Sequence, residues 1–134
     1  MRTYLTAFLI GMAAALFVAG SRAATSDLPA QSSTQAGVTV KAAPRSLSGS
    51  AWEFELVFDT HSGELTDDLE KTAVLIADGG ASRSPLKWQG DPPGGHHRKG
   101  VLLFKPVSPR PGSIELRIQR TGEASPRSFR WQLK

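Results

Sequence analysis

Short apolar runs with a period of two, separated by clusters of glycine, proline, serine and aspartate, make up most of the chain after residue 37. The clearest run begins at Trp52 and ends at Asp59, where large apolar residues occupy every second position. Successive side chains of a strand point to opposite faces, so this pattern predicts a strand with one buried face. No segment keeps a helical period for three turns. The best helical candidate is a single turn over 66–71, capped by Thr66.

About seven such strands in roughly a hundred residues predict an all-β, immunoglobulin-like antiparallel β-sandwich. A small β-barrel is the alternative. The strands are expected near residues 38–41, 52–59, 72–77, 85–89, 101–104, 114–119 and 129–134. The side chains expected to face the core are Trp52, Phe54, Leu56, Phe58, Leu75, Leu103, Ile114, Leu116, Ile118, Phe129 and Trp131.

The first 23 residues have the pattern of a signal peptide. Arg2 gives a positive start, residues 4–20 are uncharged and mostly apolar, and Ser21 and Ala23 are small residues at a cleavage site. We expect cleavage before Ala24 and a periplasmic or secreted protein. An uncleaved anchor is the alternative, and we expect membrane contact only in that case. Residues 24–36 are predicted to be a flexible lead-in, and residues 37–134 the sandwich domain.

The composition excludes several classes of protein. The 134 residues contain no cysteine, which excludes disulfides, thiolate metal sites, a catalytic thiol and a lipid-anchored cysteine. Cleavage after Ala23 removes Arg2 and Arg22 and leaves 14 basic against 12 acidic residues. That small excess does not suit nucleic-acid binding. Cleavage also removes Met1 and Met12, and with them the sulfur ligands that a dedicated copper(I) carrier needs.

Charge is unevenly distributed along the chain. Residues 46–80 hold eight acidic residues and one basic residue, whereas residues 81–134 hold eleven basic and three acidic residues. Strands from the two segments become neighbours in a sandwich. We therefore expect the opposite charges to pair across strands, and we favour this over a polarised docking surface.

All three histidines lie at two points of the sequence. His61 follows Asp59 at the end of the second predicted strand, and His96 and His97 precede the fifth. These two strands are commonly antiparallel neighbours in an immunoglobulin-like sheet, so the histidines are expected to meet at one rim. Imidazoles beside a carboxylate suit zinc or copper(II). We therefore predict metal ligands at His61, His96, His97 and Asp59.

Other interpretations of the same residues remain open. Asp91 is a candidate extra oxygen ligand, and Trp88 has no predicted facing. The histidines are alternatively structural, bonding the backbone within turns. The glycine-rich, basic loop before the fifth strand lacks the spacing of a phosphate-binding loop, so we interpret it as solvated. Ser62 beside His61 has no nucleophile-elbow motif around it, and we do not expect an enzyme.

Four segments together resemble a family of small exported bacterial domains. They are Asp59-Thr60-His61-Ser62, Trp88-Gln89-Gly90, the stretch from Gly94-Gly95-His96-His97-Arg98 to Phe104, and Phe129-Arg130-Trp131. The resemblance covers residues 50–133 and implies a β-sandwich and the grouping of these residues, but no particular activity. From the residue chemistry we predict an exported module that binds copper(II) or zinc. The alternative is a non-catalytic domain that binds a periplasmic protein.

Overall fold

The computed structural model describes residues 27–133, so the predicted signal peptide (1–23) and the first residues of the lead-in (24–26) lie outside the described part. Within these described residues, nine strands and one short helix follow in the order β1 (Gln31–Gln35), β2 (Val38–Ser46), β3 (Trp52–Thr60), α1 (Leu69–Thr72), β4 (Ala73–Ala77), β5 (Ser82–Arg83), β6 (Lys87–Gly90), β7 (His97–Phe104), β8 (Ser113–Ile118) and β9 (Arg127–Gln132). The one helix within residues 27–133, α1, is not long and apolar enough to cross a membrane.

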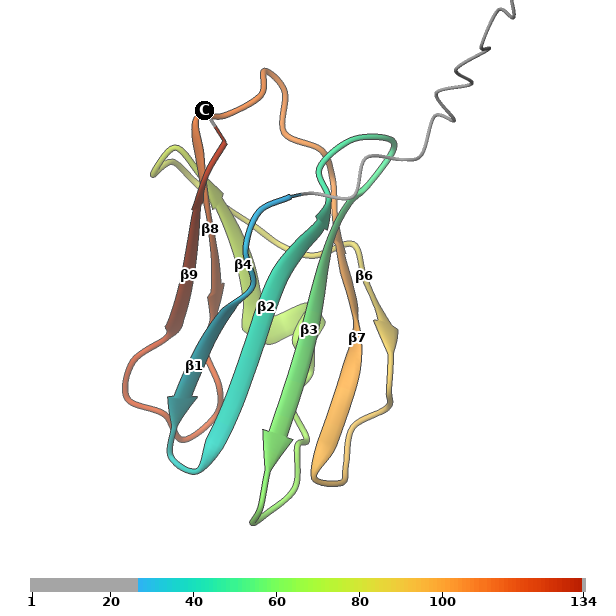
Figure 1. Cartoon of the computed structure of the whole chain (residues 1–134), viewed down its shortest axis with the longest axis vertical. Helices are drawn as coiled ribbons and strands as arrows, with labels where there is room; N and C mark the ends of the chain where they lie inside the picture. The colour runs from blue at the N-terminus through green and yellow to red at the C-terminus, as the bar shows by residue number, and fades with distance from the viewer. Residues whose placement is uncertain (1–26, 134) are drawn as a thin grey trace, which may run out of the picture.

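The strands form two sheets that face one another (Figure 1). One sheet has the order β1-β2-β3-β7-β6, and the other has the order β5-β4-β8-β9. Every pairing between neighbours is antiparallel. The predicted antiparallel β-sandwich is therefore confirmed, and because the two sheets do not close on each other, the structure is not the alternative barrel.

The core lies between the sheets, as the alternation of apolar residues predicts. All but one of the side chains expected to face inward are buried. The exception is Leu103, which is only half-buried, whereas Leu102 and Phe104 are fully buried. The four apolar residues from Val101 to Phe104 do not alternate, so their facing could not be read from the run itself. The β3–β7 register determines which of these side chains face the core, because Leu102 lies opposite the buried Phe54 of β3.

The structure differs from the expected flexible lead-in over Gln31–Gln35, which form β1. A tight turn at Ala36 and Gly37, both with positive φ (51° and 76°), returns the chain into β2. Two successive residues in this conformation match the right-handed twist of a hairpin. The strand has no apolar alternation because it is a polar edge strand. Hydrogen bonds from Arg127 and between Gln31 and Arg130 hold it in place. The sandwich thus begins before residue 37.

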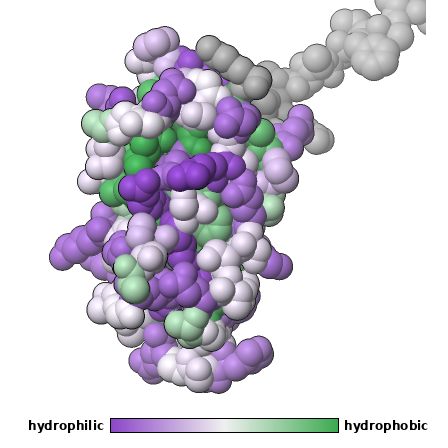
Figure 2. Space-filling model, turned by 90° about the vertical axis from the view of Figure 1, so that its left-hand side faces the viewer, coloured by the Kyte–Doolittle hydropathy of each residue, from purple (hydrophilic) through white to green (hydrophobic). Residues whose placement is uncertain are grey.

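Side chains close the side of the sandwich where β1 and β9 are the edge strands. The amide of Gln31 donates to the carbonyl of Arg130, and its Oε1 accepts from the Arg130 N–H at 3.1 Å. Trp131 Nε1 donates to the Pro29 carbonyl at 2.8 Å. Seen from this side, the surface is mostly hydrophilic, with hydrophobic residues in its upper half (Figure 2). These contacts occupy backbone groups that an open edge would offer to another chain.

The predicted helical turn forms slightly later than expected. The helix α1 comprises Leu69–Thr72, and its cap is Asp68, whose Oδ1 accepts from the Glu70 N–H at 3.1 Å. Both Thr66 and Asp68 have suitable capping side chains. The later start lets Leu69 turn into the core, where it is buried.

Buried charges connect the two sheets at the end of the sandwich that carries the β1–β2 turn. Arg120, after β8, pairs with Asp67, which precedes α1, and also with Glu123. Glu123 in turn binds Arg127 at the start of β9, at 2.6 Å. Arg127 also donates to three carbonyls of the β1–β2 hairpin, those of Ser33, Gln35 and Val38. Arg120–Asp67 and Lys99–Glu55 join the acidic segment to the basic one, whereas Glu115 and Glu123 pair with arginines of their own segment.

Candidate functional site

The predicted site begins with a carboxylate and an imidazole on adjacent strands. Asp59 near the end of β3 lies directly opposite His97 at the start of β7. His97 Nδ1 and Asp59 Oδ1 are hydrogen-bonded, while Nε2 of the same ring has no hydrogen-bond partner among residues 27–133. The side chains are 59% and 52% exposed, respectively. The pair therefore presents one imidazole nitrogen on an exposed rim.

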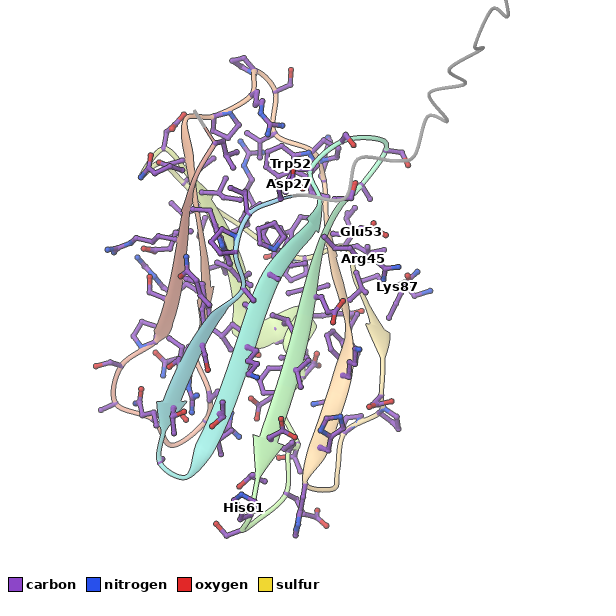
Figure 3. All side chains as sticks on the ribbon, in the orientation of Figure 1. Asp27, Arg45, Trp52, Glu53, His61 and Lys87 are labelled. Atoms are coloured by element: carbon purple, nitrogen blue, oxygen red, sulfur yellow. The ribbon has the colours of Figure 1, made fainter. Side chains whose placement is uncertain are left out.

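The other two histidines lie on the same rim. The Thr60 N–H donates to the His96 carbonyl at 2.9 Å, which places His61 and His96 on neighbouring stretches of backbone. Figure 3 places His61 at the tip of the molecule, just beyond the end of β3. Both side chains are exposed. The prediction that topology brings the two histidine segments together is thus confirmed for the backbone.

The side chains of these residues do not form a ready-made metal cage. Within residues 27–133, no group of three or more histidine and carboxylate side chains is arranged to hold a metal ion. The structure brings together Asp59 and His97 as a pair, with His61 and His96 flanking them. Asp91, the candidate extra ligand, accepts instead from the backbone N–H of Lys99 at 2.9 Å.

Hydrogen bonds order the loops that carry the histidines. Gly94 donates to the Leu65 carbonyl at 2.8 Å, and Leu65 donates to the Gly95 carbonyl at 3.0 Å. Both glycines have positive φ, 120° and 74°, conformations that other residues rarely adopt. Thr60 Oγ1 donates to the Ser62 carbonyl at 2.7 Å, which holds the turn after β3. The rim is therefore built on a defined backbone.

A buried arginine directly behind the rim ties these loops together. Arg98 is only 2% exposed and donates to the backbone carbonyls of Leu65, Asp67 and Asp91. Burial is the main reason that the pKa of Arg98 is lowered, but neighbouring carboxylates oppose that shift. Because Arg98 follows His97 in sequence, its anchoring also fixes the backbone that presents the imidazole.

Trp88, whose facing the sequence left open, packs against this arginine. Its ring lies 5.6 Å from the Arg98 guanidinium carbon, and its Nε1 donates to the Asp91 carbonyl at 2.9 Å. The indole covers Gly90 and Gly100, where added Cβ atoms would lie within 3 Å of the ring. Trp88 is therefore a packing residue that helps to hold the loop before β7.

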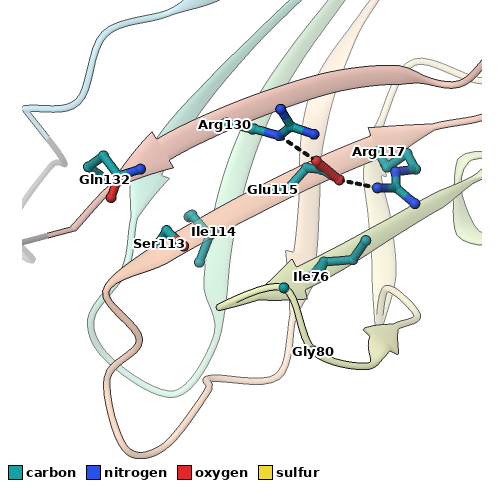
Figure 4. Close-up of a pocket in the computed structure, with 9 residues that line it drawn as sticks. Ile76, Gly80, Ser113, Ile114, Glu115, Arg117, Arg130 and Gln132 are labelled. Carbon is teal, nitrogen blue, oxygen red and sulfur yellow. Dashed lines mark hydrogen bonds and ion pairs between the residues drawn. The ribbon is translucent and has the colours of Figure 1, made fainter.

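A second feature, which the sequence pattern did not predict, is a hollow of about 430 Å³ on the outer face of the β5-β4-β8-β9 sheet. Figure 4 shows Glu115 of β8 between Arg117 and Arg130, with Gln132 at one end of the hollow. Alternation did place Glu115 and Arg117 on the strand face opposite the core residue Leu116. The part contributed by Arg130 depends on the β8–β9 register, which the sequence pattern does not define.

Comparison of the chain with protein-family models, with curated proteins and with solved structures finds no match.

Proposed function

We propose that the protein is an exported β-sandwich module that binds a divalent transition-metal ion, copper(II) or zinc, at the rim formed by the end of β3 and the start of β7. The observation that carries the proposal is the hydrogen bond between Asp59 and His97 Nδ1. Histidines that bind metals usually donate their other ring N–H to a carboxylate or carbonyl, which fixes the ring and raises the basicity of the ligating nitrogen. In this chain Nε2 of His97 would be that ligand.

His61 and His96 would supply the further imidazoles. Both side chains are exposed, so they can rotate toward His97 without disturbing the core. The backbone hydrogen bond from Thr60 to His96 already holds their segments together. Imidazole ligands without sulfur favour zinc or copper(II) over copper(I). This ligand set supports binding or carrying a metal ion rather than catalysis.

A domain that binds a periplasmic protein is the second candidate. In that case the same hydrogen bond would only pin β3 to β7 as a cross-strand pair. The two candidates differ in a measurable way, because a purely structural pair would leave the protein with no stoichiometric affinity for metal.

Calorimetric titration of the purified protein with zinc and copper(II) tests the proposal. We expect one ion per chain in the unchanged protein and loss of binding in the triple variant His61→Ala, His96→Ala, His97→Ala. Asp59→Asn should weaken binding by about 10- to 100-fold, because it removes the carboxylate that orients the ring. Glu64→Gln, which changes an exposed carboxylate in the turn after β3, is the matched control and should bind normally. Equal binding by the unchanged protein and the triple variant would contradict the proposal.

A further inference from the structure

The hollow on the outer face of the β5-β4-β8-β9 sheet has a volume of about 430 Å³. Pockets for small organic ligands typically range from about 300 to 1,000 Å³. It lies on a different sheet from the histidine rim and shares no residue with it. Anything that binds there would therefore act independently of the proposed metal site.

Two arginines hold a carboxylate in the floor of this hollow. Glu115 lies directly opposite Arg130 in the β8–β9 pairing, and Arg117 is two residues further along β8 on the same face. Arg130 Nε donates to Glu115 Oε1 at 2.6 Å, and Arg117 Nη2 donates to Oε2 at 2.5 Å. Glu115 is 8% exposed, whereas the Arg130 and Arg117 side chains are 73% and 41% exposed. The guanidinium groups thus stand above the carboxylate and toward solvent.

The charges of this cluster do not cancel. Two guanidinium groups and one carboxylate leave a net positive charge. Each arginine donates to Glu115 through a single nitrogen. The remaining N–H groups of the two guanidinium groups have no acceptor among residues 27–133. Burial alone would raise the pKa of Glu115, but hydrogen bonds from Arg130, Ser128 and Arg117 outweigh it and lower that pKa below its ordinary value. Glu115 therefore stays ionised and keeps the two arginines in place.

The walls of the hollow offer both polar groups and an apolar surface to a ligand. Ser113 and Gln132 contribute polar groups at one end, and Ile76 contributes an apolar surface. The turn at Gly79 and Gly80 forms another wall, and a Cβ added at Gly79 would have no neighbour within 4 Å, so the space beside it is open.

Another carboxylate, that of Asp78 just before the turn at Gly79 and Gly80, already accepts hydrogen bonds. Asp78 Oδ1 accepts from the backbone N–H groups of Gly112 and Ser113, at 2.9 and 3.0 Å. Its charge is thereby compensated by backbone donors at the start of β8. This leaves the arginine pair as the positively charged part of the hollow that offers unused donors to an anion.

We propose that this hollow binds a small organic carboxylate, with its carboxylate on the unused N–H groups of Arg117 and Arg130 and its body against Ile76. The planar guanidinium group is suited to a carboxylate because it can donate two parallel hydrogen bonds. Two arginines already oriented by Glu115 lose little conformational freedom when such a ligand binds.

NMR titration of the purified protein with N-acetylvaline, and separately with its primary amide, tests this inference. We expect saturable shifts of the backbone amides of Gly79, Gly80 and Ser113 with the acid, and binding of the amide weaker by at least about tenfold, because the amide lacks the charge. Arg130→Gln should weaken binding of the acid by a similar factor. Gln132→Glu, which leaves both arginines intact and adds a negative charge at the wall, should do the same.

The control variant is Lys41→Gln, which removes an exposed positive charge from the opposite sheet. It should bind the acid as the unchanged protein does. Equal binding of acid and amide, a similar loss of binding in Lys41→Gln, or shifts that never saturate would overturn the inference. Inorganic phosphate is the third probe: if it binds as tightly as N-acetylvaline, the assignment to an organic carboxylate is wrong.

Discussion

Arg120 and Asp67 form a two-point ion pair inside the sandwich, with Nε donating to Oδ2 at 2.7 Å and Nη2 donating to Oδ1 at 3.3 Å. The two residues are 53 positions apart in the sequence, and their side chains are 10% and 6% exposed. The pair ties the segment between β3 and α1 to the end of β8. The chain has no cysteine and so no disulfide, and the ion pairs among Asp67, Arg120, Glu123 and Arg127 connect distant segments instead.

Removing the charge of Asp67 should destabilise the fold substantially. Asp67→Asn leaves Arg120 buried with only Glu123 to compensate it. Breaking a buried ion pair in this way typically costs about 3–5 kcal/mol of unfolding free energy. Urea unfolding measures the change. Asp68→Asn, at an exposed helix cap where asparagine serves equally well, should change stability by less than about 1 kcal/mol. Equal effects of the two variants would contradict this account of the pair.

Arg127→Leu should loosen the β1–β2 hairpin more than the rest of the protein. β1 has polar side chains, and three carbonyls of the hairpin accept hydrogen bonds from Arg127. Native-state hydrogen exchange should therefore accelerate more in β1 than in β4, which lies in the other sheet. An equal acceleration in both strands would show that Arg127 acts on global stability alone.

Gly100→Ala tests the close approach of β6 and β7. A Cβ at position 100 would lie 2.6 Å from both the Gly90 Cα and Trp88 Cζ2, so the indole must move. Overpacking of this kind costs about 1–3 kcal/mol, and tryptophan fluorescence should change with it. Lys99→Ala, at the exposed neighbouring position on the same strand, should leave the fluorescence unchanged. A stable Gly100→Ala protein with unchanged fluorescence would contradict the packing role of Trp88.

Stability should fall in acid because of the buried glutamates. Hydrogen bonds from Arg127 are the largest cause that lowers the pKa of Glu123, and the pKa of Glu115 is also lowered, both from an ordinary value of 4.5. A carboxyl whose pKa is lower in the folded state stabilises the fold fully above its unfolded pKa. That contribution is lost as the pH falls below 4.5 toward and through the folded pKa.

Urea unfolding between about pH 7 and pH 3 measures this dependence. The Glu123→Gln variant should be less stable near neutral pH and should lose less stability on acidification than the unchanged protein. A parallel pH dependence in the two proteins would show that Glu123 is not responsible.

The strands that alternate clearly could be predicted because burial of one face dictates their sequence. Residues 52–59 and 114–118 are examples, and the two-sheet arrangement followed from the number of such runs. β1 could not be predicted in this way. It is held by a turn with positive φ at Ala36 and by Arg127, which is about ninety residues away in the sequence.

Of the two candidate sites, the histidine site was predicted from the sequence and the hollow around Glu115 was not. The sequence predicted that the segment with Asp59 and His61 would meet the segment with His96 and His97, because neighbouring antiparallel strands bring such ends together. The specific Asp59–His97 pair depends on the β3–β7 register and on the start of β7 at His97, four residues before the predicted strand. The facing of each histidine side chain depends on local loop geometry that the pattern does not encode. The hollow around Glu115 was missed because its second arginine, Arg130, comes from another strand, and only the register places it there.

The central claim, a metal ligand at His97 Nε2, is tested most directly by NMR of the imidazole nitrogens during titration with zinc. Without zinc, the hydrogen bond to Asp59 should place a proton on His97 Nδ1, because a carboxylate oxygen accepts. One equivalent of zinc should shift the resonance of His97 Nε2 and a ring nitrogen of His61 or His96. If the His97 Nε2 resonance stays unchanged after one equivalent of zinc, the metal site is ruled out and the pair only joins β3 to β7.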